Sequence, residues 1–166
     1  MKLLIPIDGS QASLAALNHA DGLHRSGVRV VAILLHVQPR MHRHISRFTT
    51  RAARDALRAE RSAAAMAPAI ETLTRAGLPF VALTELGTPA AAIAAVARRE
   101  GVDEIVMGVG RHPEWLRWIN PSIARGVMAR TDIPVTVLAR GRVGALQRYG
   151  VPAGIAGLAA LLWAVE

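Results

Sequence analysis

Apolar residues along the chain gather in five short runs, several of them rich in β-branched side chains. The runs cover residues 2–7, 28–37, 79–86, 103–109 and 133–139. Continuous apolar runs of this length are typical of strands buried on both faces. Helical patterns lie between them: Leu14, Leu17 and Leu23 recur at helical spacing, and Pro89 and Gly101 fit the start and end of another helix. The alternation predicts an α/β fold, an open five-stranded parallel sheet with helices on both faces.

The composition is that of one globular domain. The chain has 166 residues, of which 52% are hydrophobic and 19% charged. It has no cysteine, which excludes disulfides and thiolate metal sites and gives no sign of an oxidising compartment. The apolar run before Asp8 is too short for a secretory signal, so we expect a cytoplasmic protein. The net charge of +8, carried almost wholly by arginine, favours an anionic partner without identifying it.

Candidate binding residues follow the carboxyl ends of the predicted strands. Open parallel sheets hold their ligands outside these ends. Asp8, Val37 and residues 108–111 occupy such positions. His36 precedes Val37 and points to the opposite face of the strand, and we expect it to be a hydrogen-bonded histidine of the core.

Several segments together resemble one known family. The stretch "LLIPIDGSQASLAALNHA" is followed in order by "VAILLHV", "LGTPAAAIAAVA", "VDEIVMG" and "ARTDIPVTVLA". At this spacing the chain resembles the universal stress protein family over residues 1–140, which leaves residues 141–166 as a C-terminal hydrophobic extension. The resemblance implies a homodimer through the last strand, around Val135 to Leu138, and in one branch of the family an ATP site. It also implies that Asp8, Val37, Met107 and Ile123 neighbour a bound adenine nucleotide.

The phosphate motif of the ATP-binding branch is only partly present. That motif is Gly, two residues, Gly, nine residues, Gly, and then Ser or Thr. Gly108 and Ser122 match it, whereas Arg111 and Pro121 stand at the second and third glycine positions and Gly110 falls one place early. The arginine side chain occupies the approach of a phosphate, and proline has no N–H to donate. These changes favour an altered or empty site.

A second interpretation keeps the anion site. Asn120 fits a helix N-cap with Pro121 at the first helical position, so later amides would form an ordinary helix N-terminus that attracts anions. Arg111 would then supply a charge-assisted contact in place of the lost backbone donors. A bound ATP or AMP and a nucleotide-free pocket both remain open from the sequence. Two roles also fit Asp8. It is either a pocket residue or, together with Ser10, a cap of the first helix.

No catalytic or metal-binding constellation is evident in the sequence. His42 and His44 are two residues apart, so a helix would point them away from a shared metal. There is no Ser/His/Asp order with a nucleophile elbow and no carboxylate pair beside a glycine-rich cleft. We therefore assign no catalytic residue and expect slow ATP hydrolysis at most.

The region after the second predicted strand carries a stripe of arginines. They stand at positions 40, 43, 47, 51, 54, 58 and 61, within an arc of about 80° on a helix. The side expected to pack on the sheet carries Ile45, Ala52, Ala56, Ala63, Met66 and Ile70. Pro68 removes one helical hydrogen bond and fits a kink. The stripe is either a solvated face or a surface for an anionic partner. Because no aromatic residues lie between the arginines, nucleic acid is the less favoured partner.

Residues 150–165 form an uncharged apolar tail. As a helix the tail would span about 24 Å, short of the ~30 Å hydrocarbon core of a membrane. Contact with the domain, a partner protein or a membrane surface is open. We expect a stress-response binding and signalling module with a degenerate adenine-nucleotide pocket. The alternative is a nucleotide-free interaction protein that uses its loop, basic helix and tail.

Overall fold

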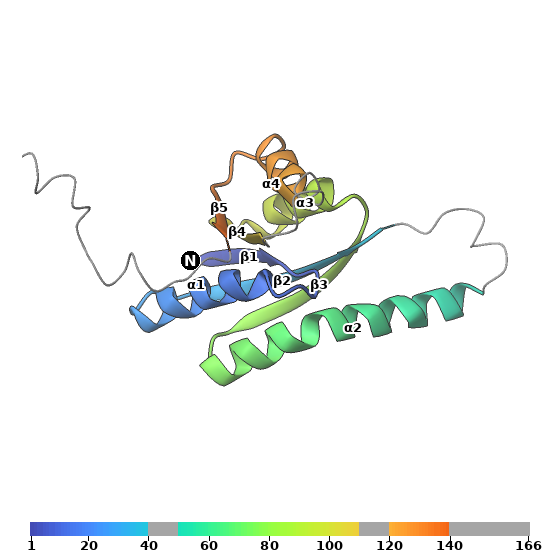
Figure 1. The fold of residues 1–166 in the computed structure, drawn as a ribbon, viewed down its shortest axis with the longest axis horizontal. Helices are drawn as coiled ribbons and strands as arrows, with labels where there is room; N and C mark the ends of the chain where they lie inside the picture. The colour runs from blue at the N-terminus through green and yellow to red at the C-terminus, as the bar shows by residue number, and fades with distance from the viewer. Residues whose placement is uncertain (40–49, 110–119, 140–166) are drawn as a thin grey trace, which may run out of the picture.

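The computed structural model describes residues 1–39, 50–109 and 120–139 (Figure 1). Its elements are β1 (Lys2–Pro6), α1 (Ser13–Arg25), β2 (Val31–Gln38), α2 (Arg51–Ala76), β3 (Phe80–Leu86), α3 (Pro89–Glu100), β4 (Glu104–Val109), α4 (Asn120–Met128) and β5 (Val135–Ala139). The predicted strands are all present, some with shifted ends. The fifth begins after Pro134, since proline has no N–H for a sheet hydrogen bond.

The five strands form one parallel sheet in the order β3-β2-β1-β4-β5. Helices α1 and α2 cover one face, and α3 and α4 cover the other (Figure 1). This arrangement confirms the expected fold class. Because the chain winds outward from β1 to β3 and then returns to β4 on the other side of β1, the carboxyl ends of β1 and β4 form the switch point of the sheet.

Each face of the sheet has its own apolar core. Leu3, Ile5 and Leu34 pack with Leu17 of α1 and Leu73 of α2. The other core contains Leu4, Leu35, Ile93, Ile105 and Val127, contributed by the sheet, α3 and α4. The residues of β1 therefore alternate between the two cores, which fixes the register of this central strand and the place where it ends.

The orientation predicted for the basic helix is wrong. Ala52, Ala56 and Ala63 are exposed, whereas Met66 is buried and Ile70 half-buried. The side of α2 that faces the domain carries Ser62, Met66, Ala69 and Leu73. At 100° per residue, Arg51 and Arg58 fall within or beside this inward arc. The arginine spacing predicted that these side chains share one arc of the helix, but it did not predict how this arc is oriented relative to the domain. Arg40, Arg43, Arg47 and Ile45 lie outside the described residues.

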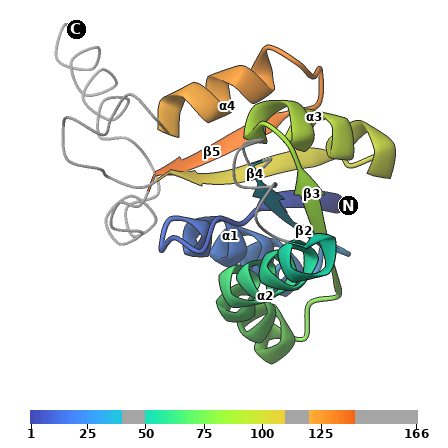
Figure 2. The same cartoon turned by 90° about the vertical axis from the view of Figure 1, so that its right-hand side faces the viewer.

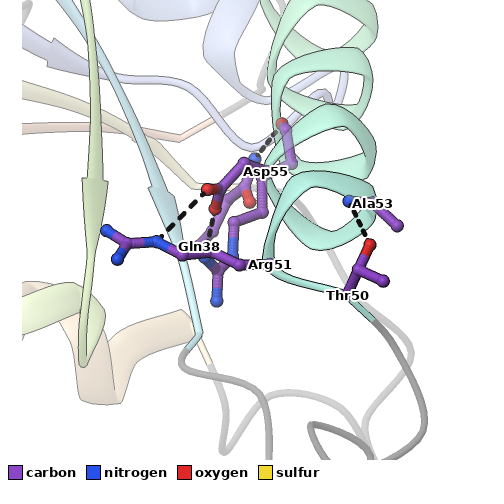
Figure 3. A network of polar contacts seen from close by, with 6 residues as sticks. Gln38, Thr50, Arg51, Ala53 and Asp55 are labelled. Atoms are coloured by element: carbon purple, nitrogen blue, oxygen red, sulfur yellow. Dashed lines mark hydrogen bonds and ion pairs between the residues drawn. The ribbon is translucent and has the colours of Figure 1, made fainter.

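The first three turns of α2 extend past the buried part of the helix. We call residues 51–61 the α2 arm; Ser62 is the first buried residue of the helix. Thr50 caps the arm through its Oγ1, which accepts a hydrogen bond from the Ala53 N–H at 3.2 Å (Figure 3). Helix α2 is continuous through Pro68.

Within the described ranges, no helix is long and apolar enough to cross a membrane. The apolar tail at 150–165 lies outside these ranges, so its contacts and the division at residues 140/141 stay predictions.

Candidate functional site

A cavity of about 100 Å³ lies at the carboxyl edge of the sheet, at the switch point between β1 and β4. Five residues expected at a binding site line it. They are Asp8, Val37, Met107, Gly108 and Ile123. These residues come from the ends of three strands and from α4, so the parallel topology brings together positions up to 115 residues apart. The cavity is the candidate site.

Asp8 is the charged group of this cavity. Its Oδ1 accepts a hydrogen bond from the Ser10 N–H at 2.9 Å and another from the Ser13 hydroxyl at 3.2 Å. Burial raises the pKa of the Asp8 carboxyl, but the hydrogen bonds from Ser10 and Ser13 outweigh it, and the net pKa is lowered. The carboxylate is therefore ionised at neutral pH. Among the described residues both hydrogen bonds use Oδ1, which leaves Oδ2 to accept one from a ligand.

The predicted capping role of Asp8 and Ser10 needs correction. The N-cap of α1 is Ala12, which makes no side-chain capping bond. Ser10 Oγ instead accepts a hydrogen bond from the N–H of Ala12 at 3.3 Å, within the turn directly before the helix. The two polar residues thus order the turn between β1 and α1, and Asp8 is directed to the cavity by that turn.

Apolar side chains form the walls of the cavity. Val37, next to the last residue of β2, lies on the side of the sheet covered by α3, and Met107 of β4 is 7% exposed. Ile93 and Pro89 of α3 add further apolar surface. An apolar hollow with one ionised acceptor suits a ring compound that carries hydrogen-bond donors.

Gly108 has a packing role that the sequence did not reveal. A Cβ at this position would overlap the carbonyl oxygen of Ala12 and lie 3.1 Å from the Ser13 nitrogen. Only glycine lets the first turn of α1 approach the end of β4 this closely. The same contact brings Ser13, the hydrogen-bond donor to Asp8, to the cavity.

The opposite end of the site is described only in part. Helix α4 begins at Asn120, so Pro121 and Ser122 lie in its first turn, in line with the expected helix start. Their backbone places a helix N-terminus at the carboxyl edge of the sheet. Gly110 and Arg111 lie outside the described residues, as do His42 and His44.

The hydrogen bond expected of His36 is confirmed, but the residue is half-buried and not part of either core. Its Nδ1 lies 2.8 Å from the carbonyl oxygen of Ile7. In the part of the chain that the structure describes, no three His, Cys, Asp or Glu residues are grouped to hold a metal ion.

Sequence reasoning missed six residues that line the cavity: Pro6, Ile7, Ser13, Leu35, Pro89 and Ile93. Pro89 could have been found, because it opens the helix that follows β3 and so had to lie at the same edge of the sheet. The positions of Ser13 and Ile93 at the cavity depend on how α1 and α3 pack on the sheet, and no local sequence pattern predicts this packing.

A doubly wound parallel sheet with a hollow at its switch point defines a class of α/β domains that hold small ligands at this edge. The chain belongs to the universal stress protein family, whose family model matches residues 1–139. A comparison with curated proteins found no match.

Solved structures with the same fold agree with this assignment. The hypothetical protein MJ0577, whose biochemical function was assigned from its structure, is 26% identical with a TM-score of 0.66, over 85% of this chain and 96% of that one. A universal stress protein family protein from Arabidopsis thaliana, with AMP bound, is 14% identical with a TM-score of 0.62, over 86% and 93%. A universal stress protein in complex with cAMP is 20% identical with a TM-score of 0.60, over 83% and 96%.

Proposed function

We propose that this universal stress protein is a stress-response signalling module that binds an adenine nucleotide at the carboxyl edge of its sheet. The observation that carries the proposal is the apolar cavity at the switch point with the ionised Asp8 beside it. Two proteins of the same fold hold AMP and cAMP, which supports an adenine compound as the ligand class. AMP and ATP are the candidate ligands.

The residues of the cavity fit the nucleoside part of such a ligand. The apolar side chains of Val37, Met107 and Ile93 provide the surface against which a purine ring packs. Asp8 Oδ2 would accept a hydrogen bond from a ring amino group or a ribose hydroxyl. The same carboxylate repels phosphate, so we place the phosphate groups away from it, toward the first turn of α4 and Ser122.

The phosphate part of the ligand is held less firmly in this proposal. Arg111 and Pro121 replace two glycines of the family's phosphate motif, and proline removes one backbone donor. Gly108 remains, but its close contact with Ala12 explains its presence without any phosphate. Most of the affinity would then come from the nucleoside, and the pocket is degenerate rather than lost. We propose slow phosphate hydrolysis at most.

Calorimetric titration of AMP into the purified protein tests the proposal. We expect binding by the wild type and a loss of about tenfold or more in Asp8→Ala, because the ligand loses a charge-assisted acceptor. Asp21→Ala is the matched control, since Asp21 lies on α1 and pairs with Arg25 instead of the cavity. Wild-type protein that gives no heat at millimolar AMP, or equal losses in both variants, would contradict nucleotide binding at this site.

We also propose a homodimer that pairs the β5 strands. In the described sheet β5 is an edge strand, and Val137 on it is 41% exposed. Pairing along Val135 to Leu138 would cover this edge.

A nucleotide-free interaction protein is the second candidate function. The observation in its favour is the α2 arm, which exposes arginines and Leu57 beyond the buried part of its helix. In this version the arm and residues 150–165 contact a protein or a membrane surface. Normal stress signalling by a variant that no longer binds AMP would favour it.

A further inference from the structure

The hydrogen-bond ladder between β1 and β2 stops at the edge of the cavity. Its last backbone bond runs from the Ile7 N–H to the Leu35 carbonyl oxygen at 2.8 Å. In a continuous parallel ladder the next bond would join the Val37 N–H to the Ile7 carbonyl oxygen, because Val37 faces β1 in the same way as Leu35. That bond is not made, and among the described residues the Val37 N–H has no hydrogen-bond acceptor. Because Ile7 and Val37 both line the cavity, the opening of the ladder is part of the site.

The side chain of His36 binds the Ile7 carbonyl group in place of Val37. Its Nδ1 lies 2.8 Å from the Ile7 carbonyl oxygen, and a carbonyl oxygen only accepts, so Nδ1 carries the proton and donates it. Successive side chains of β2 point to opposite faces of the sheet. Val37 packs with the core under α3 and α4, so His36 lies on the side of α1 and α2, and Figure 2 shows these two helix layers on either side of the sheet. The Ile7 carbonyl group is therefore held from the face opposite to Val37.

The same hydrogen bond lies at the start of the turn that carries Asp8. Ile7 directly precedes Asp8 in the chain. The next residue, Gly9, has a φ of 78° and lies against α2, where a side-chain carbon on it would be 3.6 Å from both Cα and Cβ of Ala65. The turn is thus fixed at its start by His36 and in its middle by α2, while Asp8 Oδ1 is held by the serines that follow.

From these contacts we propose that His36 is a positioning residue of the nucleotide site. By holding the Ile7 carbonyl group, it keeps the Val37 N–H free for the ligand and fixes the turn that presents Asp8. The ligand then meets a backbone donor on β2 and the Asp8 carboxylate on the other side of the opening. His36 acts through these two groups, because its own side chain lies on the other face of the sheet. This inference rests on the proposed nucleotide function.

AMP binding and amide hydrogen exchange of two His36 variants test the inference. In His36→Leu we expect AMP affinity to fall about five- to tenfold, because the Ile7 carbonyl group loses its donor and pairs with the Val37 N–H. The exchange of the Val37 amide should become slower for the same reason. His36→Asn should restore both properties to nearly wild-type values, since Nδ2 of asparagine is bonded to Cγ as Nδ1 of histidine is, and donates at the same reach.

Thr84→Val is the matched control. Thr84 is the partner of His36 in the register of β2 and β3, and its hydroxyl forms a hydrogen bond with that of Ser62 on α2. The substitution removes a hydrogen bond on the same face of the sheet without touching Ile7. We expect it to leave AMP affinity and the exchange of the Val37 amide unchanged.

The outcomes separate this inference from the function beneath it. A loss of affinity in His36→Leu that His36→Asn restores, with Thr84→Val like the wild type, supports the role of His36. Equal losses in both His36 variants, or unchanged AMP binding in His36→Leu, overturn it and leave nucleotide binding intact. The ligand-free wild type gives a check that needs no variant: a Val37 amide that exchanges as slowly as the Leu35 amide inside the ladder overturns the inference as well. Wild-type protein that does not bind AMP overturns both.

Discussion

Gly108 at the end of β4 lies against the carbonyl group of Ala12, so closely that no side chain fits between them. This contact sets the position of the first turn of α1 and thereby of Ser13, which donates a hydrogen bond to Asp8. A glycine that the sequence pattern connects with phosphate binding is thus required for packing of the protein itself.

Gly108→Ala should destabilise the fold. The new Cβ must displace backbone atoms of α1, and overpacking of this kind costs about 1–3 kcal/mol or more. Gly22→Ala is the control, because Gly22 lies inside α1 with open space around it and should gain about 0.5–1 kcal/mol. Urea unfolding of the two variants and the wild type measures both effects. Equal stabilities for Gly108→Ala and the wild type would show that the contact is absent.

Asp8 should make stability depend on pH. Its folded pKa is lowered, so its contribution is present above the unfolded pKa of about 3.9 and is lost as pH falls through the lower folded value. Asp8→Asn should therefore be less stable than the wild type at pH 7, with the difference shrinking below pH 4. Thermal unfolding between pH 2 and 7 measures this. A difference that stays constant with pH would contradict an ionised Asp8 held by Ser10 and Ser13.

Pro68 should weaken α2. It stands inside the helix, is exposed, and cannot donate the hydrogen bond that its position requires. Pro68→Ala should stabilise the protein by about 1–3 kcal/mol, after allowance for the greater freedom of alanine in the unfolded chain. Chemical unfolding gives the value. Stability lower than that of the wild type would mean that the proline fits a local distortion of the helix.

The proposed dimer predicts different effects at the two edges of the sheet. Val137→Lys on β5 should shift the protein to monomers, because an edge lysine opposes strand pairing. Val81→Lys is the matched control: Val81 is 50% exposed on β3, the opposite edge strand. Light scattering coupled to size exclusion measures the mass of each variant. A monomeric wild type, or equal masses for the two variants, would exclude pairing through β5.

The fold could be predicted from the sequence because its signals are local. The apolar runs gave all five strands, and the rule for parallel sheets placed Asp8, Val37 and Gly108 at one edge. Met107 came from the family resemblance, and it also lines the cavity. Ile123 came from the family resemblance, and the structure places it at the same cavity.

The predictions that were wrong concern features that depend on packing between segments distant in the sequence. The arginine spacing gave an arc on α2, but which side faces the domain depends on where the sheet ends beneath the helix. Asp8 and Ser10 have the residue types of helix caps, yet α1 begins three residues after Ser10. The packing role of Gly108 arises from α1, which the sequence around Gly108 does not contain.

The most direct test of nucleotide binding is an NMR titration of the labelled protein with AMP. The account predicts saturable shifts of the backbone amides of Asp8, Val37, Met107, Gly108 and Ile123, while Gly101 and Asp103 at the opposite edge of the sheet do not move. Unchanged amide signals at millimolar AMP, or shifts confined to residues away from the carboxyl edge, would contradict it.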